Sequence, residues 1–283
     1  MRFLLSLLLS AWALHGAIPP PSTYDWEAQR WQSQIATNSG TLSASSYRVG
    51  TYFMQQVKWW GLRPLLGRVN LFLGNDTNAA TITIIRDWWT TTDYPDRLFN
   101  YTAADYSEST GLTGNGTSKY LSPAGNNTFS LAGQTTINDV HMACYVLTGS
   151  NEASYLMGYA SAGHSTCGLP ISYSGSSYIE FDLANNSASD SSGVGFYLST
   201  RTSTNSRVLY KNGSALVTRT DCSGDLGPGY FVVGAFDSAG TVTAYTTRAY
   251  CYYALGKGIP ASLVTPYRTA VRNVQLTIHR NAE

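Results

Sequence analysis

The dipeptide Asn212-Gly213 constrains the fold more than any other feature, because it stands between two β-prone runs, 207–211 and 214–220. Asn and Gly both tolerate positive φ, which suits the two-residue type I′ turn of a β-hairpin. Apolar residues then occur on both faces of the hairpin, so we expect it inside a larger β structure. The expected pairs are Val208–Val217, Leu209–Leu216 and Tyr210–Ala215.

Short β-prone runs recur through the rest of the chain. From Tyr101 to Leu255 they hold about four to eight residues each and are separated by Gly, Asn and Ser, a pattern typical of a β-sandwich or barrel. Upstream, residues 68–74 alternate like a strand. Residues 80–89 are rich in β-branched side chains and predict another strand, with a helix as the alternative. The later runs are 139–147, 154–159, 177–183, 193–199, 207–220, 230–236 and 241–255.

Helical patterns lie at the two ends of the chain. Asp25 can cap a helix whose apolar residues repeat at steps of three and four, and Ser43 can cap a second one that ends near Gly61. The tail after Pro260 has the same periodicity. Short amphipathic helices are marginal alone, so we expect all three to pack against the β structure.

Charged residues are scarce. Asp, Glu, Lys and Arg make up 12% of the 283 residues, about half the usual share. Tyr (20), Trp (7) and Gly (26) are plentiful, which is typical of secreted β proteins. The formal net charge of +1 provides no electrostatic basis for binding nucleic acid or an anionic membrane. We therefore expect no nucleic-acid partner.

The first residues have the pattern of a secretory signal. Met1-Arg2 provides a basic start, an apolar run extends from Phe3 to Ala13, and peptidases cut after small residues such as Ala13 and Ala17. The run is far shorter than the ~20 apolar residues that span a bilayer, so no membrane span is expected in the mature chain. We predict a signal peptide at 1–17 and a protein that is secreted, extracellular or at the cell surface; a membrane anchor is the alternative.

Export permits disulfides, and the chain has four cysteines, Cys144, Cys167, Cys222 and Cys251. Four cysteines allow three sets of pairings, and their spacing does not choose among them. We expect at least one disulfide with Cys251 taking part, because a free thiol in its strand would serve only as a small apolar group. A zinc site is excluded, because no two cysteines have the spacing of a metal knuckle.

Four segments together carry a family resemblance. They are GLTGNGTSKYL at 111–121, HMACYV at 141–146, the Asn212-Gly213 hairpin, and RAYCYYALG at 248–256, which leads into a helix. In this order and spacing they resemble concanavalin A-like (LamG-like) jelly rolls, above all those of phage tail or virion proteins and of secreted bacterial proteins. The resemblance covers roughly residues 65–275 and implies a two-sheet antiparallel jelly-roll sandwich. Because that superfamily holds lectins, adhesion modules, glycanases and structural proteins, the fold does not name an activity.

The stretch from Glu180 to Asp190 resembles two functional patterns of that superfamily. In bacterial β-glucanases, glutamates two positions either side of an aspartate serve as nucleophile and acid. Here Ala184 stands where the second glutamate is needed, so the acid is missing. The calcium loop of legume lectins has a similar arrangement of hard oxygen ligands, which suit Ca²⁺. The candidate calcium ligands are Glu180, Asp182, Asn186 and Asp190, and a solvated strand and loop is the simpler interpretation.

Aromatic residues provide the candidates for sugar binding. Trp59-Trp60 and Trp88-Trp89 can offer faces on which a carbohydrate ring stacks, or they can hold the N-terminal helices against the sandwich. His164 stands between small residues, and the sequence shows no evident Ser or Asp partner for a catalytic triad. No complete catalytic set is visible.

Together these patterns predict a mainly β protein in three parts: the signal peptide (1–17), an N-terminal helical lead with the first strands (18–98), and a LamG-like jelly roll with a C-terminal helix (99–283). The expected function is a secreted, non-catalytic recognition or adhesion module that binds a glycan or a cell-surface polymer. The alternative is a structural protein of a virion or cell envelope that packs against partner chains or self-associates. A glycan-active enzyme is a third hypothesis and needs an acid and a base brought together from separate strands.

Overall fold

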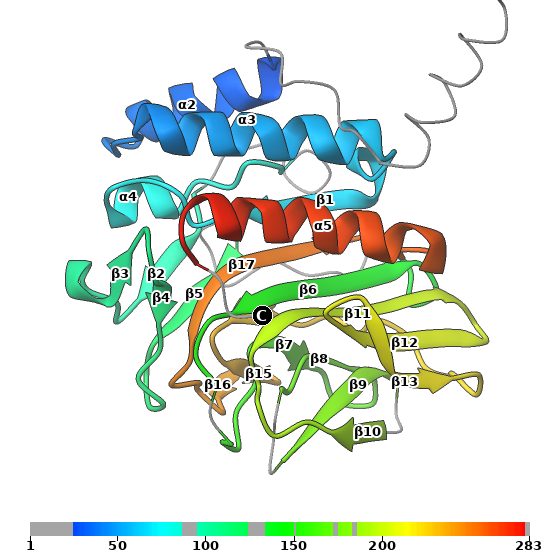
Figure 1. Cartoon of the computed structure of the whole chain (residues 1–283). Helices are drawn as coiled ribbons and strands as arrows, with labels where there is room; N and C mark the ends of the chain where they lie inside the picture. The colour runs from blue at the N-terminus through cyan, green and yellow to red at the C-terminus, as the bar shows by residue number, and fades with distance from the viewer. Residues whose placement is uncertain are drawn as a thin grey trace, which may run out of the picture.

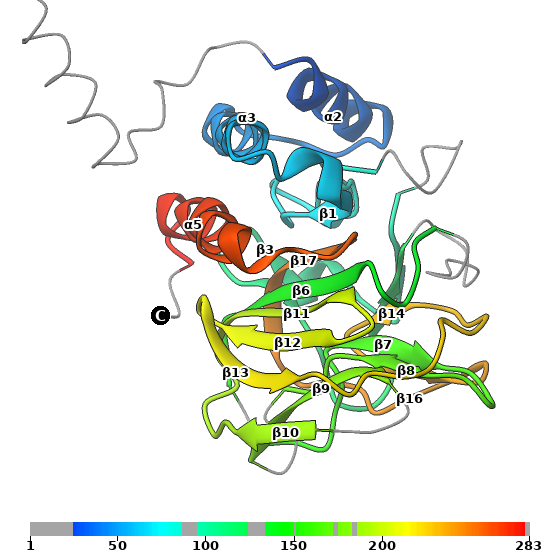
Figure 2. The same cartoon turned by 90° about the vertical axis from the view of Figure 1, so that its right-hand side faces the viewer.

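The protein was analysed as a computed structural model that describes residues 25–86, 95–123, 134–149, 151–171, 175–182 and 186–280, with the backbone alone at 179–182 and 186. Two β-sheets pack face to face, and a layer of helices covers the outer face of one of them (Figures 1 and 2). The predicted mainly β sandwich with a helical lead and a C-terminal helix is confirmed. The predicted signal peptide and Trp88-Trp89 lie outside the described residues.

The two N-terminal helices are present, each with its predicted cap. α2 (Trp26–Thr37) begins after Asp25, whose carboxylate accepts hydrogen bonds from two backbone N–H groups of the first turn, at 3.0 and 3.2 Å. α3 (Ala44–Trp59) begins after Ser43, whose hydroxyl accepts a hydrogen bond from Ser46 N at 3.0 Å. Gly61 follows α3 in the left-handed conformation (φ 67°) that commonly ends a helix.

The eight-stranded sheet lies between the helices and the second sheet (Figure 2). The pairings among its strands are antiparallel. Its order is β13 (Ser214–Arg219), β12 (Ser206–Lys211), β11 (Gly195–Ser203), β6 (Val140–Val146), β17 (Ala249–Gly256), β4 (Gly111–Thr113) and β3 (Tyr106–Ser107), and β1 (Leu66–Asn70) also pairs with β17.

The nine-stranded sheet forms the other half of the sandwich. Its pairings are antiparallel except one, the short parallel pairing of β15 with β7. Its order is β10 (Asn186–Ser189), β9 (Ser176–Asp182), β8 (Thr166–Gly168), β7 (Met157–Ala160), β14 (Val232–Val233), β5 (Tyr120–Ser122) and β2 (Arg97–Phe99), with β15 (Phe236–Ser238) and β16 (Thr241–Thr243) attached beside β7.

The hairpin predicted from Asn212-Gly213 is confirmed as β12 and β13. Both turn residues have positive φ, 48° and 81°, as a type I′ turn requires. Tyr210 pairs with Ala215 as expected, but a register shift after Leu209 places that residue opposite Val217 instead of Leu216. The turn is also tied to the next strand, because Asn212 Oδ1 accepts a hydrogen bond from Phe196 N at 2.8 Å.

Strand alternation divides the buried residues into two cores. In β17, Tyr253 and Leu255 face the second sheet, whereas Tyr252 and Ala254 face the helices. All seven residues of β6 are buried for the same reason. A strand covered on both faces has no solvent side, which explains why the central strands have continuous apolar runs instead of apolar and polar residues in alternation.

The predicted C-terminal helix packs on the outer face of the eight-stranded sheet. α5 (Ala261–Thr277) begins after Pro260 and buries Tyr267, Val271 and Val274. The hydroxyl groups of Tyr267 and Tyr252 lie 2.6 Å apart, which joins the helix to β17. α5 also contacts α3 (Figure 1).

The strand expected at residues 80–89 is wrong for its described part. Asp76 caps the short helix α4 (Thr77–Ala80), and the chain beyond it forms only an isolated bridge between Val69 and Ile85. The β-branched residues there serve the core: Ile82, Ile84 and Ile85 are buried without belonging to a strand. In the described ranges, no helix combines the length and the apolar character needed to cross a membrane.

Two tryptophans provide a matched test of this packing. Trp31 is 2% exposed and its Nε1 donates to Ile82 O at 3.0 Å, whereas Trp59 is 59% exposed. We expect Trp31→Ala to lower the free energy of unfolding by about 3–5 kcal/mol, because it opens a cavity. Trp59→Ala should change it by less than about 0.5 kcal/mol. Urea unfolding of both variants measures this; equal losses would contradict the described helix packing.

Candidate functional site

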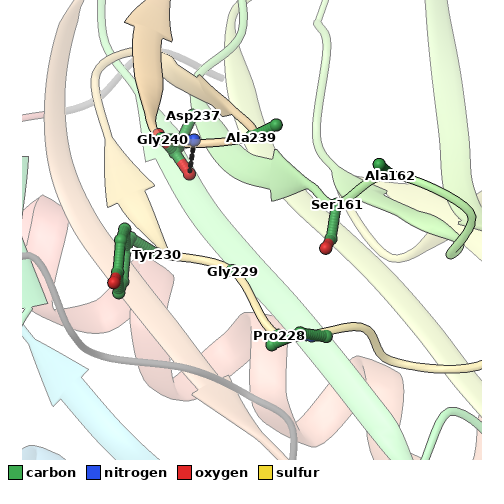
Figure 3. Close-up of a pocket in the computed structure, with 8 residues that line it drawn as sticks. All are labelled: Ser161, Ala162, Pro228, Gly229, Tyr230, Asp237, Ala239 and Gly240. Carbon is green, nitrogen blue, oxygen red and sulfur yellow. Dashed lines mark hydrogen bonds between the residues drawn. The ribbon is translucent and has the colours of Figure 1, made fainter.

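A pocket lies where two strands diverge at one edge of β7. Val232 of β14 pairs with Gly158 in the first half of β7, and Asp237 of β15 pairs with Tyr159 in the second half. β15 pairs with the second half of β7, so the chain that precedes β14 cannot pair there and turns away from β7. The cavity at this divergence has a volume of about 300 Å³ (Figure 3). Small-molecule sites commonly have about 300–1,000 Å³, so the pocket suits a small ligand group.

The pocket combines an aromatic ring with a few polar groups. Tyr230 is 44% exposed and lies on one side, and Ser161 and Ala162 lie across from it (Figure 3). Asp237 is 1% exposed, and its Oδ2 accepts a hydrogen bond from Gly240 N at 3.3 Å. An exposed ring beside a few placed polar groups is typical of sites for amphipathic ligands. The lining is completed by Pro228, Gly229 and Ala239.

Two contacts with Tyr159 hold Tyr230 in this position. The Tyr159 hydroxyl donates to Gly227 O at 3.0 Å. Gly229 lies directly against the Tyr159 ring, where an added Cβ would come within 2.0 Å of it. Phe231 is buried beside them, so its neighbour Tyr230 points outward, because successive side chains of an extended segment point to opposite faces.

His164 has a partner that the sequence did not reveal. Its Nδ1 lies 3.0 and 3.1 Å from the two carboxylate oxygens of Asp225. Ser165 N donates to Asp225 O at 3.2 Å, and Gly227 packs against the imidazole ring. No Asp partner was evident in the sequence because Asp225 lies 61 positions away, and the fold brings it to His164. The pair fastens the segment 221–231, which carries one wall of the pocket.

The structure separates Asp190 from the other predicted calcium ligands. Asp190 N donates to Gly175 O, so Asp190 lies opposite Gly175 in the hairpin of β9 and β10. Glu180 lies five residues further along β9 than Gly175. At about 3.3 Å per residue this is roughly 16 Å, whereas calcium ligands lie about 2.3–2.6 Å from the ion. The side chains of Glu180, Asp182 and Asn186 are outside the described set, so their part in calcium binding stays a prediction. Among the described side chains, no cluster of three His, Cys, Asp or Glu residues could hold a metal.

The carboxylate of Asp190 serves the sandwich itself. It accepts hydrogen bonds from Lys211 Nζ at 2.6 Å, Ser177 Oγ at 2.7 Å and Tyr197 OH at 2.5 Å. Burial opposes its ionisation, but the hydrogen bonds from Lys211, Tyr197 and Ser177 outweigh burial and lower its pKa to about 2. Asp190 thus joins β9, β11 and β12. The cation beside its carboxylate is the ammonium group of Lys211, whereas the calcium hypothesis expected a metal ion.

The disulfide expected through Cys251 is absent from the structure, in which all four cysteines are free thiols. Cys251 lies in the core under the helices, whereas Cys144 and Cys167 lie in the core between the sheets. The eight-stranded sheet therefore separates Cys251 from both. Cys222 is half-buried and lies near Arg219 O, at 3.8 Å.

Trp59 and Trp60 were predicted either to stack on a sugar or to hold the helices against the sandwich. The structure gives them different surroundings. Trp60 packs against the core under the helices, as the packing interpretation expects. Trp59 is exposed at the end of α3. The sequence-based candidates thus leave one exposed ring on the helical layer, while the pocket and its Tyr230 lie in the nine-stranded sheet.

Comparison with known proteins shows similarity in fold. No family model matches the sequence, and no curated protein is similar to it. The sialidase of Trypanosoma rangeli, solved in complex with 2,3-difluoro-KDN, is 11% identical with a TM-score of 0.51; the match covers 81% of this chain and 40% of the sialidase chain. At this identity the similarity concerns the β-sandwich fold alone.

Two further structures are more distant. Domain 4 of AbnA, a GH43 extracellular arabinanase from Geobacillus stearothermophilus in complex with arabinotriose, has a TM-score of 0.44 and 11% identity; the match covers 72% of this chain and 98% of that domain. The CBM40 of the Ruminococcus gnavus IT-sialidase has a TM-score of 0.35 and 13% identity, with 46% and 82% covered. Neither supports an argument at these scores.

Thiol accessibility tests the placement of the cysteines. Burial raises the pKa of the Cys144 thiol, and that of Cys251 to about 12, which keeps both protonated and unreactive. We expect iodoacetamide to label Cys222 first in the folded protein and all four cysteines after unfolding without reductant. Mass spectrometry counts the labels. Fewer than four labels on the unfolded, unreduced protein would restore the disulfide hypothesis.

Acid titration tests the role of Asp190. A pKa near 2 means that its charge stabilises the fold at pH values above about 4 and ceases to do so as the pH falls through 2. We expect Asp190→Asn to lower the free energy of unfolding by about 2 kcal/mol at pH 7 and to have no such effect below pH 2. Urea unfolding across this range checks it. An equal deficit at both ends would show that the charge is not the cause.

Proposed function

We propose that this protein is a secreted, non-catalytic module that recognises glycans, and that the pocket beside Tyr230 is its binding site. The observation that carries the proposal is the exposed Tyr230 ring at the rim of a pocket with a buried carboxylate, Asp237. A sugar ring has apolar faces and polar edges. The Tyr230 ring can contact its face while Asp237 and Ser161 receive its hydroxyl groups.

The position of the pocket supports this proposal. α3 and α5 cover the outer face of the eight-stranded sheet, so a glycan cannot lie across that face (Figure 2). The nine-stranded sheet has no such cover in Figure 2, and the pocket is lined by the segments that follow β7 and precede β14 and by β15 with its turn. The segment beside the pocket is fastened by Tyr159 and His164, so binding orders little additional chain.

The composition of the pocket supports the proposed non-catalytic role. Its described lining residues include one carboxylic acid, Asp237. Most glycosidases use a pair of carboxyl groups about 5–9.5 Å apart, one as acid and one as nucleophile or base. The export predicted from the first residues and the LamG-like resemblance favour the same proposal, with a glycan or another cell-surface polymer as partner.

A second candidate function rests on a different surface. Trp26 is 54% exposed and Trp59 is 59% exposed, both on the helical layer. Exposed tryptophans favour contact with a partner protein, as expected for a structural protein of a virion or cell envelope or for self-association. This surface lies on the far side of the eight-stranded sheet from the pocket (Figure 2).

A glycan array with the purified protein, with and without calcium, tests the proposal. We expect binding that Tyr230→Ala weakens at least tenfold, because the ring supplies the stacking surface. Trp59→Ala should leave it unchanged and serves as the control, since it also removes an exposed aromatic ring. If no glycan binds and light scattering shows a stable oligomer that Trp59→Ala dissociates, the structural alternative replaces the proposal.

A further inference from the structure

The chain around the pocket is acidic. Residues 220–240 supply two of the three lining segments and contain Asp221, Asp225 and Asp237 but no lysine, arginine or histidine. Among the described lining residues, Asp237 is acidic and no side chain is basic. Asp221 pairs with Arg219, and Asp225 contacts His164, so the carboxylate that a ligand in the pocket meets is that of Asp237.

Asp237 retains capacity to accept hydrogen bonds. Within the described residues its carboxylate accepts one hydrogen bond, from Gly240 N. A carboxylate has about four lone-pair sites, so a hydroxyl group that enters the pocket finds free acceptor positions. At 1% exposure the group is shielded from water, which strengthens its attraction for donors and its repulsion of anions.

The nearby basic groups are engaged by the chain itself. His164 Nδ1 contacts the Asp225 carboxylate at 3.0 Å. Arg201 Nη1 donates to Ser223 O at 3.0 Å, and its Nε donates to Ser203 O at 3.4 Å. The contacts with Asp225 and Ser223 fasten the segment that leads to Pro228, and neither His164 nor Arg201 is among the described lining of the pocket. No described lining group thus compensates the charge of an anionic sugar.

We propose that the pocket selects neutral, hydroxyl-rich sugars over anionic ones and that the Asp237 carboxylate sets this preference. The inference rests on the proposed glycan-binding function and names the class of sugar that the same pocket takes. Hydroxyl groups of a neutral sugar donate to the free lone pairs of Asp237 while its ring lies against Tyr230. A carboxylate on the sugar would instead face the Asp237 charge in a shielded site, and like charges across an interface reject a wrong ligand.

Titration calorimetry with matched sugars tests the preference. The matched pair is gluco- and glucurono-oligosaccharides of equal length, which differ by the acidic group; lactose beside sialyllactose, which adds one acidic sugar residue, is a second comparison. We expect the wild-type protein to bind the neutral member at least tenfold more tightly. The ratio should change little as salt rises, because salt screens a shielded charge much less than an exposed one.

Two variants, one at Asp237 and one control, test whether the Asp237 carboxylate causes the preference for neutral sugars. Asp237→Asn keeps the size of the side chain and an oxygen that can accept from Gly240 N, but removes the charge. We expect it to reduce the neutral-to-acidic ratio at least tenfold. Asp221→Asn makes the same charge change in the adjacent segment, at a side chain that is 64% exposed and not among the lining residues, and should leave the ratio unchanged.

The outcomes separate this inference from the proposed function. Equal or tighter wild-type binding of the acidic members overturns the neutral-sugar preference and leaves glycan binding in place. An unchanged ratio in folded Asp237→Asn overturns the assignment to Asp237. Failure of every sugar to bind overturns the proposed function as well. If Asp237→Asn does not fold, Asp237→Ser, which also removes the charge and keeps an acceptor oxygen, makes the same test: an unchanged ratio in the folded variant overturns the assignment to Asp237.

Discussion

The arrangement depends on β17, a strand buried on both faces. Its side chains alternate between the helices and the second sheet, so it must be covered from both sides. A buried ionic network holds β1 against it: Asp96 accepts hydrogen bonds from Arg68 Nε at 3.1 Å, Asn70 Nδ2 at 2.8 Å and Tyr253 OH at 2.8 Å. A buried ion pair such as Arg68–Asp96 is tolerated only when its remaining hydrogen-bonding capacity is filled, and here Asn70 and Tyr253 fill it. The network thus joins the helical lead to the sandwich.

This cover determines where a ligand can bind. The helices that bury one face of the eight-stranded sheet also close that face to a glycan, which leaves the second sheet and its loops (Figure 1). Arg280 reinforces the closed side. It donates to Leu71 O at 3.0 Å and to Cys251 O at 3.2 Å, so the chain after α5 is tied to both β17 and the segment after β1. The helices therefore cover the eight-stranded sheet, whereas the candidate binding pocket belongs to the nine-stranded sheet.

Local chemistry in the sequence predicted the elements, and non-local pairing determined the site. Asn212-Gly213, Asp25 and Ser43 act within a few residues, so their turn and caps were predictable. The pocket requires Ser161 to meet Asp237, some 76 positions later, through the parallel pairing of β15 with β7. No local pattern predicts that pairing. Gly227-Pro228-Gly229 does predict a turn, and the aromatic residue directly after it, Tyr230, could have been chosen as a candidate binding residue on that ground.

A single bulge places Cys251 in a different core from Cys144 and Cys167. Tyr253 and Leu255 face the core between the sheets, so strict alternation would place Cys251 there as well, beside the face of Cys144 and Cys167. A register shift between Tyr250 and Tyr252 turns Cys251 to the helix side instead. One extra residue in a strand reverses every side chain beyond it. The types and spacing of the residues do not reveal such a shift. The register of β17 against β6 therefore decides which cysteines share a core.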